Sequence, residues 1–176
     1  MIKSSYWKNK LPVRAEGAFV GKICCFTGHR EIYGRYADRL YSLLKNKVSE
    51  LAENGFSEFR AGGAVGFDTL AALAVLERKN SHGDVSLSLF LPCENQEKYW
   101  SQSEKETYRY ILAHADSVSY VQKYYSNGVM QERDRRLVDG SDLCVAFLKS
   151  KDGGTAYTCG YAKRRGVDVI NLFSML

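Results

Sequence analysis

Two glycine-rich segments of the chain have the composition of phosphate-binding turns. Residues 62–68 read Gly-Gly-Ala-Val-Gly-Phe-Asp and residues 152–155 read Asp-Gly-Gly-Thr, and each stands between an apolar run and a helical pattern. A glycine-rich turn at a helix N-terminus exposes backbone N–H groups and the positive end of the helix dipole, and both attract phosphate. Glycine permits this close approach because it has no Cβ atom. The two segments therefore predict an anionic ligand.

Other residues fall at positions where they could contact the same ligand. Arg30 follows an apolar run and would supply positive charge, and Trp100 could stack on a base. The predicted ligand-binding residues are Thr27, Gly28, Arg30, Gly62, Gly63, Gly66, Asp68, Gln96, Trp100, Arg133, Gly153, Gly154 and Thr155.

For three members of this set, the pattern is compatible either with a ligand contact or with an ordinary structural or solvent-exposed role. The Asp68 carboxylate accepts from a ribose hydroxyl or caps its own helix, and capping is slightly favoured. Trp100 stacks on a base, worth about 1–3 kcal/mol, or anchors its loop to the core, with equal weight. Arg133 lies beside the buried stripe of a helix whose other charges we expect to be solvated, so it could point into the ligand site.

Several common kinds of site are excluded by pattern. Residues 62–68 do not match GxGxxG, and GxxxxGK[ST] occurs nowhere, which argues against ordinary dinucleotide dehydrogenases and P-loop kinases. The three histidines are far apart and no Cys/His cluster occurs, so no metal site is predicted. The five cysteines form no CxxC pair, which favours a reducing compartment, and we expect a cytoplasmic location with no membrane segment.

The elements that must position these residues alternate regularly along the chain. Apolar runs of strand length cover residues 23–27, 57–61, 85–91, 117–121, 143–148 and 167–172. Helical patterns cover residues 36–54, 104–115 and 129–139, and two more follow the glycine-rich segments to about residues 80 and 165. Continuous apolar strands are typical of sheets covered on both faces. We predict a single Rossmann-like, doubly wound, mainly parallel sheet of about six strands with helices on both faces, over residues 23–176.

The net charge of +5 over 176 residues belongs to one end of the chain. Residues 1–30 hold six Lys and Arg residues against one Glu, so the remainder is neutral. We interpret residues 1–22 as an irregular basic N-terminal arm. Because the predicted domain is neutral, the charge does not indicate nucleic-acid binding.

The motifs, taken in order, resemble those of the SLOG superfamily, which includes DprA/Smf and LOG proteins, and within it the YpsA-like branch. The residues that carry the resemblance are the segment 25–30, the segment 62–68, Gln96 with Trp100, Met130 with Arg133, the pairs 138–139 and 141–142, and Gly153 to Tyr157 with Tyr161 and Ala162. The resemblance implies a Rossmann-like domain that binds a nucleotide or a derivative such as ADP-ribose. Relatives in the LOG branch are phosphoribohydrolases, and relatives in the DprA branch bind single-stranded DNA.

Catalytic residues of the LOG branch are only partly present. That branch has an Arg-Lys pair after Met-x-Glu and a Glu three residues after the Thr of its glycine loop. Here Arg133 matches, Asp134 replaces the Lys, and Thr158 replaces the Glu. Hydrolysis of an N-glycosidic bond needs a positioned carboxylate, which Thr158 lacks. Any catalysis would rest on Arg133, Asp68 or Asp134.

The leading hypothesis is therefore binding of a nucleotide derivative, in a sensor or regulatory role and without a further cofactor. The alternatives are a LOG-type nucleotide N-glycosidase and a single-stranded nucleic-acid binder of the DprA kind. Apolar helix faces could pair two subunits, and the relatives commonly form dimers, so a homodimer is an open alternative.

Overall fold

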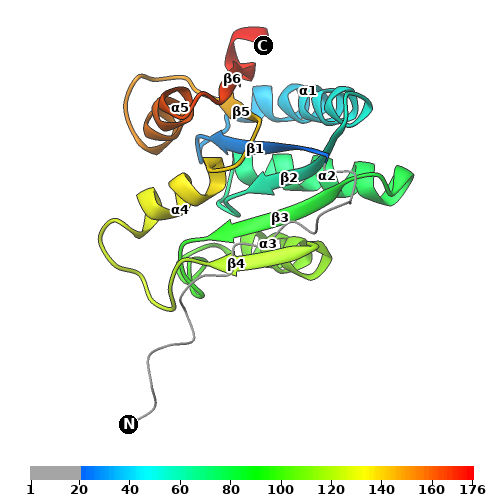
Figure 1. Ribbon diagram of the computed structural model, residues 1–176. Helices are drawn as coiled ribbons and strands as arrows, with labels where there is room; N and C mark the ends of the chain where they lie inside the picture. Colours follow the sequence, from blue (N-terminus) through cyan, green and yellow to red (C-terminus); the bar gives the residue numbers. More distant parts are fainter. Residues whose placement is uncertain (1–20) are drawn as a thin grey trace, which may run out of the picture.

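The computed structural model describes residues 21–176, apart from the side chain of residue 35. Almost all of the predicted N-terminal arm, residues 1–22, lies outside the described residues. The described part alternates strands and helices as predicted (Figure 1). Its elements are β1 (Lys22–Gly28), α1 (Gly34–Glu53), β2 (Phe56–Ala61), α2 (Phe67–His82), β3 (Ser86–Leu91), α3 (Gln102–His114), β4 (Ser117–Tyr120), α4 (Val129–Val138), β5 (Leu143–Phe147), α5 (Gly154–Arg164), β6 (Asp168–Asn171) and the 3₁₀ helix η1 (Leu172–Met175).

The six strands form one sheet in the order β4-β3-β2-β1-β5-β6, and every neighbouring pair is parallel. Helices α1, α2 and α3 cover one face, and α4 and α5 cover the other (Figure 1). The predicted doubly wound fold is confirmed. The chain builds outward from β1 to β4 and then crosses back to place β5 on the other side of β1. The strand order therefore reverses between β1 and β5, which is where open α/β sheets bind ligands.

Local capping explains one difference in element bounds. Helix α3 begins at Gln102, two residues before the predicted start, because Ser101 and Glu104 form a reciprocal capping box. The Ser101 side chain accepts from the Glu104 N–H, and the Glu104 carboxylate accepts from the Ser101 N–H at 2.7 Å.

Four phenylalanines form the floor beneath the carboxyl ends of the central strands. Phe26 of β1 lies 6.0 Å from Phe59 and 6.3 Å from Phe67 between ring centroids, and Phe67 stacks on Phe147 at 5.8 Å. A Cβ atom at Gly28 would lie 2.3 Å from the Phe67 ring, so glycine is required at the end of β1. The start of α2 is thereby fixed against β1 and β5.

Three features bearing on function are absent from the described part of the chain. No helix in residues 21–176 is long and apolar enough to span a membrane. No group of three or more His, Cys, Asp or Glu side chains in that part is placed to hold a metal ion. All five cysteines lie within it, and each is buried and forms no disulfide.

Candidate functional site

A cavity of about 350 Å³ lies at the point where the strand order reverses. Its walls come from the end of β1 and the loop after it, from the β2–α2 loop, from one face of α4 and from the start of α5. The predicted residues that line it are Thr27, Gly28, Arg30, Asp68, Arg133, Asp134, Gly154 and Thr155. Residues far apart in sequence thus meet in one site.

Arg133 is the buried positive charge of this cavity, with 6% of its surface exposed. Its Nη1 donates to the Gly62 carbonyl oxygen at 2.6 Å, and its Nε donates to Asp134 Oδ1 at 2.8 Å. Nη1 also lies 3.8 Å from Asp68 Oδ2. The guanidinium therefore joins α4 to the β2–α2 loop while contributing to the cavity wall.

Burial shapes the ionisation of both carboxyls beside Arg133. Burial raises the pKa of Asp68 to about 6, against the opposing effects of the Arg133 charge and a hydrogen bond from the Ala64 N–H. Burial also raises the pKa of Asp134 above its usual value, with Arg133 and the Thr158 hydroxyl acting in the opposite direction. Asp68 does not cap α2, because its Oδ2 accepts from the Ala64 N–H at 3.4 Å and no side-chain cap is present at that helix.

The β2–α2 loop is closed by the protein itself, and its glycines do not line the cavity. A Cβ atom at Gly62 would lie 1.8 Å from Arg133 Nη1, and one at Gly66 would lie 2.1 Å from the backbone oxygen of Arg30. Gly66 also has φ +82°, a conformation that other residues rarely adopt. Glycines in this loop are therefore required by contacts within the protein.

The β5–α5 loop is open. A Cβ atom at Gly154 would have no heavy atom within 4 Å, and Gly154 lines the cavity. Thr155 follows it at the N-terminus of α5, where backbone N–H groups carry partial positive charge. An anion could approach the backbone here without displacing any side chain.

Two of the predicted ligand-binding residues, Gln96 and Trp100, lie outside the lining of this cavity and both contact Tyr108. Gln96 Nε2 donates to the Gly63 carbonyl oxygen and to the Tyr108 hydroxyl, both at 3.1 Å. Trp100 packs edge-on against Tyr108, with ring centroids 5.2 Å apart, and contacts the core. Both residues support the β2–α2 loop from the α3 side, and the structure favours anchoring as the role of Trp100.

The Thr at the position of the LOG glutamate has a structural partner. Thr158 is fully buried, its hydroxyl donates to the Gly154 carbonyl oxygen at 2.9 Å, and it lies beside Asp134. It links α5 to α4 behind the cavity. Asp68 and Asp134 are the carboxyl groups that line the cavity itself.

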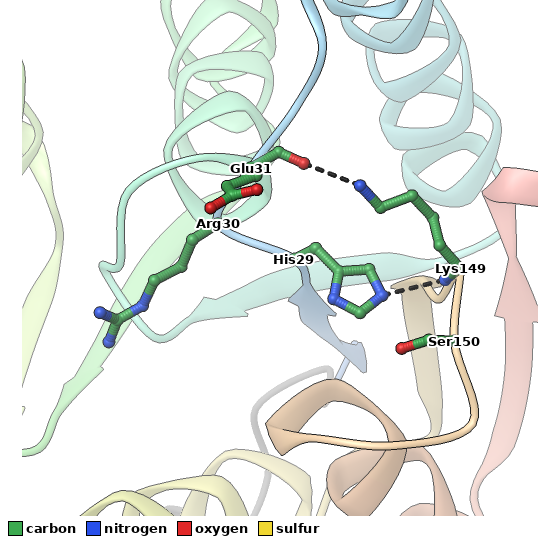
Figure 2. A pocket seen from close by; sticks show the side chains of 5 residues that line it. All are labelled: His29, Arg30, Glu31, Lys149 and Ser150. Carbon is green, nitrogen blue, oxygen red and sulfur yellow. Dashed lines mark hydrogen bonds between the residues drawn. The ribbon is translucent and has the colours of Figure 1, made fainter.

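A second cavity, of about 340 Å³, adjoins the first and shares His29 and Arg30 with it. Figure 2 shows the Lys149 ammonium reaching the Glu31 carbonyl oxygen, at 2.9 Å, while the Arg30 guanidinium points away from this pair. The Lys149 backbone N–H donates to His29 Nε2 at 3.0 Å. Burial, followed by the Lys149 charge, lowers the pKa of His29, so the ring is neutral at neutral pH with its proton on Nδ1.

The lining residues missing from the sequence-based set are the polar His29, Glu31, Lys149 and Ser150 and the apolar Phe26, Ala64, Met130 and Leu137. Lys149 carried a usable signal, because it is the first residue after the apolar run 143–148 and so had to lie at the carboxyl edge. His29 stood inside the segment 25–30. The apolar residues carried no signal distinct from the core.

The fold and cavity define a doubly wound α/β protein with a cavity where the strand order reverses. Comparison with known proteins gives the particular group. The model of the YspA SLOG family (YpsA) matches residues 25–168, and the chain belongs to this family. The predicted resemblance to the YpsA-like branch is thereby confirmed.

Sequence relatives and solved structures agree with this assignment. UPF0398 proteins of Bacillus thuringiensis (strain Al Hakam) and Bacillus cereus (strain AH187) are each 29% identical over 126 residues, which is 70% of this chain and 68% of theirs. DNA processing protein A (DprA) from Streptococcus pneumoniae matches with a TM-score of 0.64 at 18% identity, over 85% of this chain and 49% of that one.

DNA processing protein A from Helicobacter pylori, a structure described for its single-stranded DNA binding mode, matches with a TM-score of 0.59 at 17% identity, over 85% of this chain and 64% of that one. The chain thus spans about half of the S. pneumoniae protein and under two thirds of the H. pylori one. At these identities the likeness shows a common fold.

Proposed function

We propose that this protein binds a nucleotide or nucleotide derivative, such as ADP-ribose, in the cavity between the ends of β1 and β5. The observation that carries the proposal is the open backbone at Gly154, which together with Thr155 lines the same cavity as Arg133 and Arg30. A phosphate there would meet helix N–H groups, a hydroxyl and positive charge at once.

The remaining lining suits the rest of a nucleotide. The Asp68 carboxyl can accept from a ribose hydroxyl, as acidic residues do in other doubly wound nucleotide sites. Met130 and Leu137 give apolar surface for a base. With no catalytic group assigned, a sensor or regulatory role fits this arrangement.

The test uses Arg30, which is exposed and forms no ion pair with any described residue. Isothermal titration calorimetry with ribonucleoside monophosphates and ADP-ribose should give binding to the wild type, and Arg30→Ala should weaken it about tenfold or more. The melting temperature should stay nearly unchanged because the side chain is exposed. Arg39→Ala on the exposed side of α1 is the matched control and should bind as the wild type does. If Arg30→Ala and Arg39→Ala bind the nucleotides with equal affinity, Arg30 does not contribute to binding.

A second candidate function, hydrolysis of a nucleotide N-glycosidic bond, is favoured by the pKa of Asp68. A carboxyl with a pKa of about 6 is poised to exchange a proton near neutral pH, and it lines the cavity. Incubation of the protein in excess with nucleoside monophosphates and NAD, followed by chromatography, would detect released base. No base above the blank would exclude hydrolysis of those compounds.

Single-stranded DNA is the third ligand class, suggested by the description of the H. pylori relative. If the protein binds single-stranded DNA, an oligonucleotide should be retarded in a gel-shift assay, and its affinity should fall steeply as salt is added. No retardation at low salt would exclude it, and competition between an oligonucleotide and a nucleotide would show that they use the same cavity.

A further inference from the structure

We propose that the two adjoining cavities form one site for a ligand with two phosphate groups, a nucleoside diphosphate or its sugar ester, and that Lys149 holds the second phosphate. This inference rests on the proposed nucleotide function and specifies its ligand. It starts from the fact that the second cavity shares His29 and Arg30 with the first, so the two are continuous around the end of β1.

Positive charge in the second cavity is not taken up by ion pairs within the protein. Within residues 21–176, neither Arg30 nor Lys149 belongs to any of the ion pairs, whereas Arg133 in the first cavity is balanced by Asp68 and Asp134. The second cavity is lined by Arg30 and Lys149 against one carboxylate, that of Glu31, with which neither forms an ion pair. A single phosphate held at Gly154 and Arg30 would leave the Lys149 ammonium without an anionic partner.

Lys149 is held in place while keeping donors available. Its Nζ donates one hydrogen bond, to the Glu31 carbonyl oxygen, and lies 4.9 Å from the centroid of the Tyr33 ring and 5.7 Å from that of Phe147. An ammonium group has three donors, so two remain for a phosphate. Cation–π contacts on two rings limit the positions of the side chain.

The backbone around Lys149 is fixed by the neighbouring loop. The His29 ring accepts from the Lys149 N–H, and the His29 carbonyl oxygen accepts from the Phe67 N–H at 3.1 Å. His29 thus connects three loops that line the two cavities. A neutral His29 ring also retains an Nδ1–H donor.

The other polar groups of the second cavity suit a sugar attached to the second phosphate. Glu31 presents a carboxylate there, which would repel a third phosphate and can accept from sugar hydroxyls. The Ser150 hydroxyl donates to the Asp152 carbonyl oxygen at 3.2 Å and can still accept. This lining favours a diphosphate, free or esterified with a sugar, over a triphosphate.

The experiment compares affinities for matched pairs of ligands by calorimetry. The probes are the mono- and diphosphates of adenosine, guanosine, cytidine and uridine, together with ADP-ribose. For the nucleoside that binds best, the wild type should bind the diphosphate about tenfold more tightly than the monophosphate. This is the difference expected from one additional charge-assisted hydrogen bond. ADP-ribose binding tighter than ADP would identify the sugar ester, and ADP binding as tightly or more so would identify the free diphosphate.

Two variants assign the preference to Lys149. Lys149→Gln should reduce the diphosphate-to-monophosphate ratio to below about threefold, while Lys149→Arg, which keeps the charge, should retain most of it. Lys151→Gln is the matched control, because Lys151 is exposed on the same loop and lines neither cavity.

The outcomes separate this inference from the proposed function. A wild-type ratio near one, or a ratio that survives Lys149→Gln, would overturn the inference while monophosphate binding still supported the function. The wild-type ratio needs no variant, so it decides even if Lys149→Gln fails to fold. No binding of any probe would overturn the proposed function and this inference with it.

Discussion

The two glycine-rich loops resemble each other in sequence but differ in what surrounds them. The β2–α2 loop packs against the Arg133 side chain and the Arg30 backbone, whereas the β5–α5 loop at Gly154 faces open space. Glycine in the first loop is required by protein contacts, whereas a Cβ atom at Gly154 in the second would meet no other heavy atom. The comparison shows that a glycine-rich turn in the sequence does not by itself predict open backbone at the end of a strand.

The largest expected effect comes from filling the closed loop. Gly66→Ala should destabilise the protein by about 3 kcal/mol or more, because a Cβ would overlap the Arg30 carbonyl and the residue would keep a positive φ. Urea unfolding monitored by circular dichroism measures this change.

Gly55→Ala separates the two causes. Gly55 has φ +87°, but a Cβ atom there would have no heavy atom within 4 Å, so this variant should cost only about 1 kcal/mol. Equal destabilisation by both variants would show that the β2–α2 loop is not closed.

The closed loop should also make stability depend on pH through Asp68. A carboxyl whose pKa is about 6 in the folded protein, above its unfolded value, favours folding most where it is protonated. This contribution is lost as the pH rises from about 4 to about 6. Relative to the wild type, Asp68→Asn should therefore gain about 2 kcal/mol of stability between about pH 4.5 and pH 7.

Urea titrations of both proteins at the two pH values measure this difference. Asp38→Asn, an exposed position on α1, serves as the control and should follow the wild type. A difference between wild type and Asp68→Asn that does not vary with pH would contradict the assignment to Asp68.

The smallest effect on stability is expected in the open loop. Gly154→Ala should change the free energy of unfolding by less than about 1 kcal/mol, because alanine is well tolerated in a helix and meets no neighbour. Its methyl group should nevertheless weaken nucleotide binding about tenfold by occupying the cavity. Gly160→Ala, in the same helix and away from the cavity lining, should leave binding unaffected. If Gly154→Ala binds nucleotides as tightly as the wild type, the open β5–α5 loop is not part of the binding site.

The fold was predictable because each strand is a continuous apolar run and each helix follows within a few residues. The rule that parallel strands end at one edge also placed Thr27, Arg30, Asp68 and Thr155 together correctly. Short-range patterns were sufficient for both results.

The sequence could not show which polar side chains would form hydrogen bonds within the protein. Gln96 is hydrogen-bonded to Gly63, 33 positions away, and to Tyr108, 12 positions away. Arg133 is hydrogen-bonded to Gly62, 71 positions away. Such contacts depend on the final packing of α3 and α4 against the sheet. Lys149 was missed although its place directly after the apolar run 143–148 puts it at the carboxyl edge of the sheet. What the sequence could not show is its contact with His29, 120 residues away.

The return of the chain from β4 to β5 has a consequence for folding. The Ile23 N–H of β1 donates to Asp142 Oδ2 at 2.7 Å across 119 residues, so the first strand receives its last neighbour only when most of the chain is in place. Closing so long a loop is slow compared with forming local contacts. The β1 and β2 side of the cavity can form with the early strands, and the α4 and α5 side completes it later. A molecule bound between these halves would oppose their separation, and would raise the free energy of detaching the C-terminal segment according to its concentration and affinity.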